Sequence, residues 1–202
     1  MKKLLLFGSS HVAYLRNYDI TRVHHLSGEK VRFIYRPFSG KSFEFFINNP
    51  YLIDRVLRCV PDYILVLFGG NSIKYTVQKS EVLTNCRIFY EILHEKIQLI
   101  NPNAIIIAHQ VPLRFNRNPN NKHHCPPPQE FKIFRDYLNN KIKKLWCKHY
   151  MILIGGPNCL DNESMFRDGV HLNVAGLKIQ LLLIIEKLDF IISYQKSLPQ
   201  QS

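Results

Sequence analysis

Three short clusters of polar residues have types and spacings that suit nucleophilic catalysis by a serine. They are Gly8-Ser9-Ser10-His11, Gly69-Gly70-Asn71-Ser72 and Asp168-Gly169-Val170-His171. A serine hydroxyl becomes a nucleophile when a histidine takes its proton and a carboxylate orients that histidine. Asp168 and His171 are three residues apart, so one turn can place the carboxylate against one imidazole nitrogen. The clusters predict Ser10 as nucleophile, His171 as base, Asp168 as its orienting acid and the Asn71 amide as an oxyanion donor.

Five short apolar runs predict the strands that position these clusters. They are Leu4–Phe7, Val31–Tyr35, Tyr63–Phe68, Ala104–Ala108 and Met151–Ile154. Helical patterns alternate with them, roughly over Phe43–Cys59, Glu81–Ile100, Glu130–Cys147 and Val174–Ile192. Continuously apolar strands are typical of a sheet covered on both faces, and strand–helix alternation favours parallel pairing. The sequence predicts an α/β protein of three α/β/α layers around a flavodoxin-like, five-stranded parallel sheet.

Ligands of such a sheet bind where the strands end at their carboxyl side. Ser10 lies just past the first predicted strand, Asn71 just past the third, and Asp168 with His171 in the loop after the fifth. The three clusters are therefore expected to meet at one edge of the sheet.

Length and composition bound the remaining possibilities. The chain has 202 residues and five scattered cysteines, none in CxxC spacing. We expect one domain over 1–195, a disordered tail over 196–202, and neither a disulfide framework nor a zinc site. No apolar run reaches membrane-helix length, and the run after Lys3 is too short for a signal peptide. A reduced, cytoplasmic monomer without metal or cofactor is expected.

The motifs also resemble a known family. "FGSSH", "FSGKS", "FGGNS" and "DGVHLN" stand in the order of the four blocks of the SGNH hydrolases, also called GDSL esterases or lipases. The resemblance spans residue 4 to about 180. It implies a carboxylic ester hydrolase with the triad Ser10, His171 and Asp168, acting on a small-molecule ester or lipid. It also implies an oxyanion hole made by the Ser10 backbone N–H with Gly40 and Asn71.

Two positions depart from the family pattern. Ser9 stands where the first block usually has Asp, and Ser72 stands where the third usually has a second acid. Neither belongs to the triad, so we expect the rate to suffer rather than the reaction. "GSSHV", "VPLRF" and "KIFRDYLNNKIKKLW" are similar to the esterase domains of some non-LTR retrotransposons and their stand-alone animal relatives.

Positive charge is the compositional outlier, with a net charge of +12. Between Arg114 and Lys148 there are nine Lys or Arg against Glu130 and Asp136. In the predicted helix there, Lys141, Lys144 and Lys148 recur on a face away from the apolar stripe. This region can attract nucleic acid or an anionic membrane surface, or it can be a solvated face of a basic protein.

Each candidate also has a structural interpretation. Ser10 can be only a helix N-cap, His171 only a surface residue at the start of the last helix, and Asn71 only a turn residue. His11 is not expected in the triad, and His123-His124-Cys125 and Cys147 with His149 are expected to be loop residues. Three hypotheses remain: an active serine esterase, a degenerate domain that binds an acylated ligand without turnover, and a basic module associated with nucleic acid.

Overall fold

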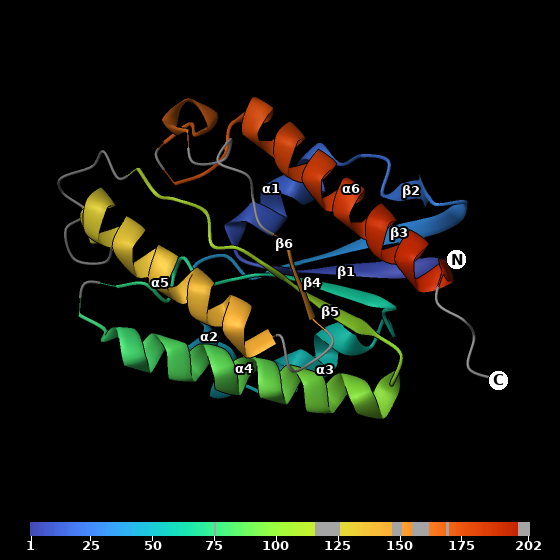
Figure 1. The fold of residues 1–202 in the computed structure, drawn as a ribbon, viewed down its shortest axis with the longest axis horizontal. Coiled ribbons are helices and arrows are strands. Elements are labelled where there is room, and N and C mark those ends of the chain that lie inside the picture. The colour runs from blue at the N-terminus through green and yellow to red at the C-terminus, as the bar shows by residue number, and fades with distance from the viewer. Residues whose placement is uncertain (75, 116–125, 147–150, 155–161, 169, 198–202) are drawn as a thin grey trace.

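The computed structural model describes residues 1–74, 76–115, 126–146, 151–154, 162–168 and 170–197. Its elements follow the chain in this order: β1 (Lys2–Gly8), α1 (Ser10–Tyr18), β2 (Val23–Leu26), β3 (Glu29–Pro37), α2 (Phe43–Ile47), α3 (Tyr51–Leu57), β4 (Tyr63–Leu67), α4 (Lys79–Ile100), β5 (Ile105–His109), α5 (Pro128–Trp146), β6 (Met151–Ile154), a 3₁₀ turn (Glu163–Met165) and α6 (Val174–Ser197). Figure 1 shows them wrapped around one twisted sheet.

The sheet has the order β2-β3-β1-β4-β5-β6, and its last five strands are parallel. This confirms the predicted α/β class and the flavodoxin-like order of the five parallel strands. The sheet also has a sixth strand, β2, which pairs antiparallel with the beginning of β3. Because β2 is short and reads VHHL, it lacks the apolar run on which the sequence analysis relied.

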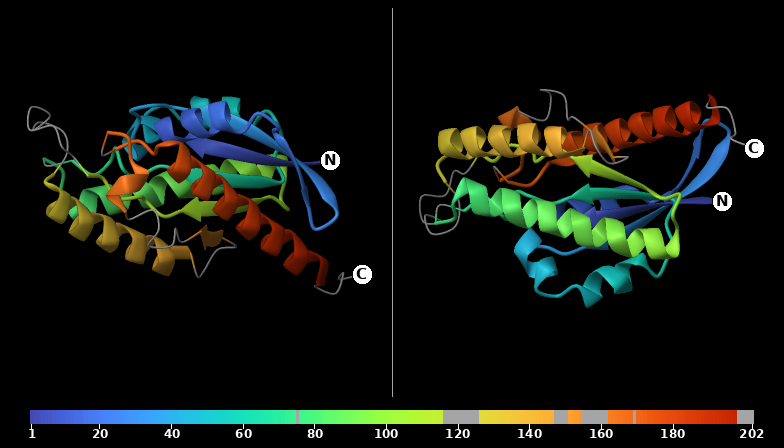
Figure 2. Two further views of the ribbon diagram at one scale, coloured as in Figure 1. Left: turned by 90° about the horizontal axis from the view of Figure 1, so that it is seen from above. Right: turned by 60° about the horizontal axis from the view of Figure 1, so that its bottom comes forward.

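Two hydrophobic clusters cover the two faces of the sheet. One lies under α2, α3, α4 and α5 and is rich in phenylalanine. The ring centroids of Phe7, Phe46, Phe68 and Phe89 lie within 6.0 Å of one another in every pair. The other lies under α1 and α6. The two further views in Figure 2 show the helices on both sides of the sheet. The predicted three layers are therefore present.

The predicted helix over Phe43–Cys59 is two helices, α2 and α3. Asn48-Asn49-Pro50 separates them, because a proline restricts the preceding residue and removes a backbone donor. The other predicted helices match α4, α5 and α6 with end shifts of a few residues. Within the described residues, no helix is both long enough and apolar enough to cross a membrane. The predicted tail is described only to Ser197, the end of α6.

Candidate functional site at the carboxyl edge of the sheet

A tight turn at the end of β1 presents Ser10. The N–H of Ser9 donates to the carbonyl of Leu67 at 3.2 Å, and α1 begins at Ser10. A Cβ on Gly8 would lie 2.6 Å from a Val12 methyl and 2.8 Å from the Leu67 carbonyl oxygen, so only glycine fits there. The N-cap position belongs to Ser9, whose side chain makes no capping bond, which removes the capping interpretation of Ser10. Ser10 is half-buried at the carboxyl edge of the sheet.

Asp168 and His171 form a hydrogen-bonded pair on the turn before α6. Nδ1 of His171 lies 2.6 Å from Oδ2 of Asp168. The other carboxylate oxygen accepts the backbone N–H groups of Val170 at 2.9 Å and His171 at 2.7 Å. Although partial burial alone would raise the pKa of Asp168, these hydrogen bonds and the His171 side chain hold it at about 2. The carboxylate is therefore ionised at neutral pH and fixes a proton on Nδ1 of His171, which leaves Nε2 free as a base.

Backbone pairing on both sides holds this turn in place. Phe166 and Leu172 form an antiparallel bridge, and Arg167 N–H donates to the His171 carbonyl at 2.9 Å. Oδ1 of Asn173 accepts the Gly176 N–H at 3.0 Å, so Asn173 caps α6. The Asp–His pair is thus braced by a small hairpin and by a capped helix.

The His171 ring lies against α1. Its centroid is 5.1 Å from that of Tyr14 and 6.3 Å from that of His11. Within the described chain, no hydrogen bond joins Ser10 to His171; such bonds are often long before substrate binds and tighten in the reacting complex. The structure therefore brings the predicted base to the helix that begins at the predicted nucleophile.

Tyr14 and Arg167 extend this contact, and neither was predicted from the sequence. The Arg167 guanidinium lies 4.3 Å from the Tyr14 ring centroid and donates to the Tyr14 hydroxyl. Arg167 also lies 3.7 Å from the Asp168 carboxylate. Tyr14 comes one helical turn after Ser10, a spacing that places the two residues on the same face of α1. That spacing was the only signal in the sequence.

The predicted oxyanion residues follow β3 and β4, the two strands that pair with β1. Phe38 N–H donates to the Gly8 carbonyl at 2.7 Å, which ties the turn after β3 to the end of β1. Gly40 lies in that turn with φ of +75°. The Asn71 side-chain amide donates to the Lys41 carbonyl at 3.3 Å, so Asn71 reaches the same turn from the end of β4.

Arg114 orients Asn71, although in the sequence it stood out only as one charge of the basic region. Its guanidinium donates to Oδ1 of Asn71 at 2.6 Å and stacks 5.6 Å from the Phe131 ring centroid. Because the guanidinium can only donate, the Asn71 oxygen must face it and the NH2 group must face away. That NH2 group carries two protons, and the Lys41 carbonyl uses one of them.

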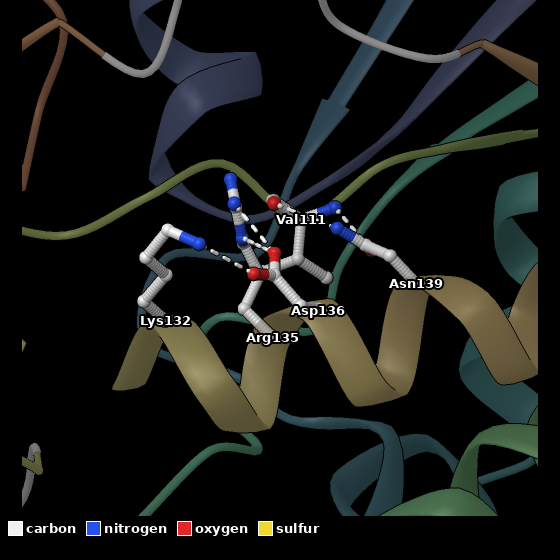
Figure 3. Close-up of polar contacts among 5 residues, drawn as sticks. All are labelled: Val111, Lys132, Arg135, Asp136 and Asn139. Carbon is white, nitrogen blue, oxygen red and sulfur yellow. Dashed lines mark hydrogen bonds and ion pairs between the residues drawn. The ribbon is translucent and has the colours of Figure 1, made fainter. Parts of the chain in front are cut away.

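Figure 3 shows Asn139 of α5 in contact with Val111, which lies just after β5. Oδ1 of the buried Asn139 accepts the Val111 N–H at 3.0 Å, and its Nδ2 donates to the Val111 carbonyl at 3.3 Å. Nearby, Lys132 and Arg135 both donate to Asp136, at 2.8 Å and 2.6 Å. Two cations of the predicted basic region are thus paired with its own acid.

The rest of that basic region is described only in part. Arg117, Lys122 and Lys148 lie outside the described residues, and of the side chain of Lys144 nothing is described. Lys141 lies 5.6 Å from the Tyr137 ring centroid. Binding of nucleic acid or membrane through the Arg114–Lys148 region stays a prediction.

Ser72 stands where the third block usually has an acid, and it makes a hydrogen bond of its own. Its buried hydroxyl accepts the Phe43 N–H at 3.2 Å, at the first residue of α2. This bond joins the turn after β4 to the segment after Gly40. The departure at position 72 therefore leaves the two oxyanion segments connected.

Three buried polar groups line a cavity beside Ser9. Nδ1 of His11, Nε2 of His109 and Oε1 of Gln180 have no hydrogen-bond partner among the described residues. All three residues line a cavity of about 20 Å³, together with Ser9, Gly70 and Arg114 among others. A cavity of this size has room for one water molecule.

We expect these histidines to make the fold sensitive to acid. Burial, then the charge of Arg114, lowers the pKa of His11 to about 3, and burial lowers the pKa of His109. In the unfolded chain a histidine takes up a proton near pH 6.5, whereas His11 in the folded protein does so only near pH 3. The contribution of these histidines to the free energy of unfolding is therefore present above pH 6.5 and is lost as the pH falls toward 3. For His11 alone the loss between pH 7 and pH 4.5 is about 3 kcal/mol.

Urea unfolding at pH 7 and at pH 4.5 measures this loss. His11→Gln should reduce the difference in unfolding free energy between the two pH values, whatever it does to stability at pH 7. Asp168 contributes little in this window, because its pKa lies below 4.5 both in the folded state, at about 2, and in the unfolded chain, at about 3.9. An unchanged difference in His11→Gln would show that His11 titrates alike in the folded and unfolded states.

No group of three or more potential metal ligands occurs among the described residues. Cys59 and Cys86 are free thiols. The candidate clusters His123-His124-Cys125 and Cys147 with His149 lie outside the described residues.

No protein-family model and no curated protein matches this sequence. Solved structures do resemble the fold. A GDSL-like lipase from Bacteroides thetaiotaomicron superposes with a TM-score of 0.64 at 18% identity, over 93% of this chain and 89% of that one. The lipase/acylhydrolase from Enterococcus faecalis gives 0.57 at 19% over 100% of both chains. A carbohydrate esterase family 3 protein from Talaromyces cellulolyticus gives 0.68 at 16%, over 96% and 99%. At these identities the likeness shows the α/β fold shared with SGNH-type esterases and lipases.

Proposed function

We propose that this protein is a serine esterase that hydrolyses a carboxylic ester through Ser10, His171 and Asp168. The observation that carries the proposal is the Asp168–His171 pair at 2.6 Å, which lies beside the helix that begins at Ser10. The likeness of the fold to esterases and acylhydrolases supports the same reaction class. The closer likeness to retrotransposon esterase domains stays a prediction from sequence.

The reaction follows from the roles of these groups. Nε2 of His171 takes the proton of the Ser10 hydroxyl as Oγ attacks the ester carbonyl, and Asp168 stabilises the imidazolium that forms. The oxyanion of the tetrahedral intermediate accepts hydrogen bonds from the Ser10 and Gly40 N–H groups and the Asn71 amide. The intermediate collapses when His171 returns the proton to the leaving alcohol. Water, activated by the same histidine, then releases the acid from Ser10.

The second candidate is a domain that binds an acylated ligand without turnover. It is motivated by Ser9 and Ser72 in place of the family's acids and by the Asn71 amide proton that the Lys41 carbonyl already holds. An intact Asp–His pair favours the esterase, because a binding domain gains nothing from an oriented base.

Labelling and turnover together separate the two candidates. The purified protein is incubated with a fluorescent organophosphonate and, in parallel, with p-nitrophenyl acetate, butyrate and decanoate. An esterase labels at Ser10 and releases p-nitrophenol in repeated turnovers. Label without turnover supports the binding domain, and absence of both contradicts the proposed esterase.

A further inference from the structure

A strongly basic pocket lies along β3, apart from the Ser10 site. Its volume is about 570 Å³. Ten residues line it, of which six are Lys or Arg and none is Asp or Glu: Lys3, Arg16, Arg22, Arg32, Arg36 and Arg58, with Phe33, Ile34, Tyr35 and Cys59. This is a different surface from the Arg114–Lys148 region that the sequence singled out.

The pocket follows from an open sheet edge. β2 pairs with β3 only from Glu29 to Arg32, and the Phe33 N–H to Arg22 carbonyl bond, at 2.8 Å, ends that contact. No strand of the described chain covers the outer edge of β3 beyond it. Figure 1 shows β2 beside only the first part of β3. Side chains from α1, β1, β3 and the end of α3 therefore surround an edge that still offers backbone groups.

The six cations have no carboxylate within ion-pair distance among the described residues. Lys3 donates to the Cys59 carbonyl at 2.9 Å, and Arg36 to the Tyr35 carbonyl at 3.4 Å. Two neighbouring acids contact pocket residues only through the backbone. Asp19 accepts the Arg22 N–H at 3.3 Å and also binds the Tyr35 hydroxyl and His24. Asp62 accepts the Lys3 N–H at 2.8 Å and also pairs with Lys2. Like charges gathered around one hollow repel one another, and this cost is relieved when an anion binds.

The type of cation points to phosphate. Five of the six are arginines, whose planar guanidinium binds phosphate oxygens in a bidentate manner. A hollow of about 570 Å³ is the size of a small-molecule site. Six cations exceed what one monovalent group needs, so the ligand should carry several phosphates.

The aromatic residues argue against single-stranded nucleic acid. Proteins that bind single strands stack bases on exposed aromatic rings. Phe33 and Tyr35 line the pocket, but they are only 2% and 5% exposed and their rings pack in the core under α1 and α6. We propose that this pocket binds a compact polyphosphorylated small molecule, held by Lys3 and the five arginines.

Titration calorimetry with inorganic tripolyphosphate tests the proposal on the whole protein. The triple variant Arg32→Gln, Arg36→Gln, Arg58→Gln removes three cations of the pocket. Its matched control, Arg87→Gln, Lys178→Gln, Lys187→Gln, removes the same charge from exposed positions outside the pocket. Circular dichroism and the melting temperature verify that both variants are folded. Because calorimetry measures binding directly, the test does not depend on ester turnover.

We expect wild type and control to bind tripolyphosphate with similar affinity, and the pocket variant to bind roughly tenfold or more weakly. Affinity of the wild type should fall as salt rises. Three results would overturn the proposal: no binding at low salt, equal weakening in both variants, or a twelve-nucleotide RNA that binds this pocket more tightly than tripolyphosphate. Equal weakening would mean that only net charge matters.

Discussion

Ser10→Ala is expected to reduce kcat for p-nitrophenyl acetate by about 10⁴-fold or more and to abolish labelling by organophosphonate. The hydroxyl has no substitute, because the tight turn at Gly8 leaves the next serine, Ser9, buried with its N–H bound to Leu67. His171→Ala should cost about as much, since without the base the hydroxyl keeps its proton.

The double variant Ser10→Ala, His171→Ala should be no slower than either single variant, because the residues act as one unit. Ser9→Ala is the matched control: it removes a neighbouring hydroxyl that makes no capping bond, so its turnover should stay near wild type. The double-mutant cycle compares steady-state rates of the wild type, the two single variants and the double variant. Protein stability is measured alongside. If losses in the two single variants multiply in the double, Ser10 and His171 act independently and the triad is misassigned.

The sequence predicted the parallel sheet well because its signal is local. Each core strand is a short apolar run of a few residues, and five of these runs are the five parallel strands. β2 has no such run, and it forms because its backbone pairs with Glu29–Arg32. The break between α2 and α3 was visible as Asn48-Asn49-Pro50, but the apolar residues on both sides outweighed it in the pattern.

The candidate site divides in the same way. Asp168 and His171 are three residues apart, so their contact was predictable from one turn. Arg114 reaches Asn71 across 43 residues, and Arg167 reaches Tyr14 across 153. Such contacts depend on how β1, β4 and the segments after β5 and β6 come together, and no local pattern encodes them. Ser72 shows the converse. From the sequence it counted as the loss of an acid, but in the structure its hydroxyl accepts a hydrogen bond from the Phe43 N–H.

Asn71→Ala is expected to lower kcat by about 10²–10³-fold with little change in KM. One amide proton binds the Lys41 carbonyl, so the other is available to an oxyanion. That charge develops only in the transition state, and removing its donor therefore affects kcat rather than substrate binding.

Arg114→Lys tests whether the orientation of that amide matters. The guanidinium at 2.6 Å from Oδ1 fixes which end of the Asn71 amide faces the site, and a lysine ammonium lacks the planar fork that also stacks on Phe131. We expect kcat to fall by roughly tenfold with KM nearly unchanged. Because Arg114 is proposed to act through Asn71, adding Arg114→Lys to Asn71→Ala should cost little more. Fully multiplicative losses, or a change confined to KM, would assign Arg114 a direct contact with substrate instead.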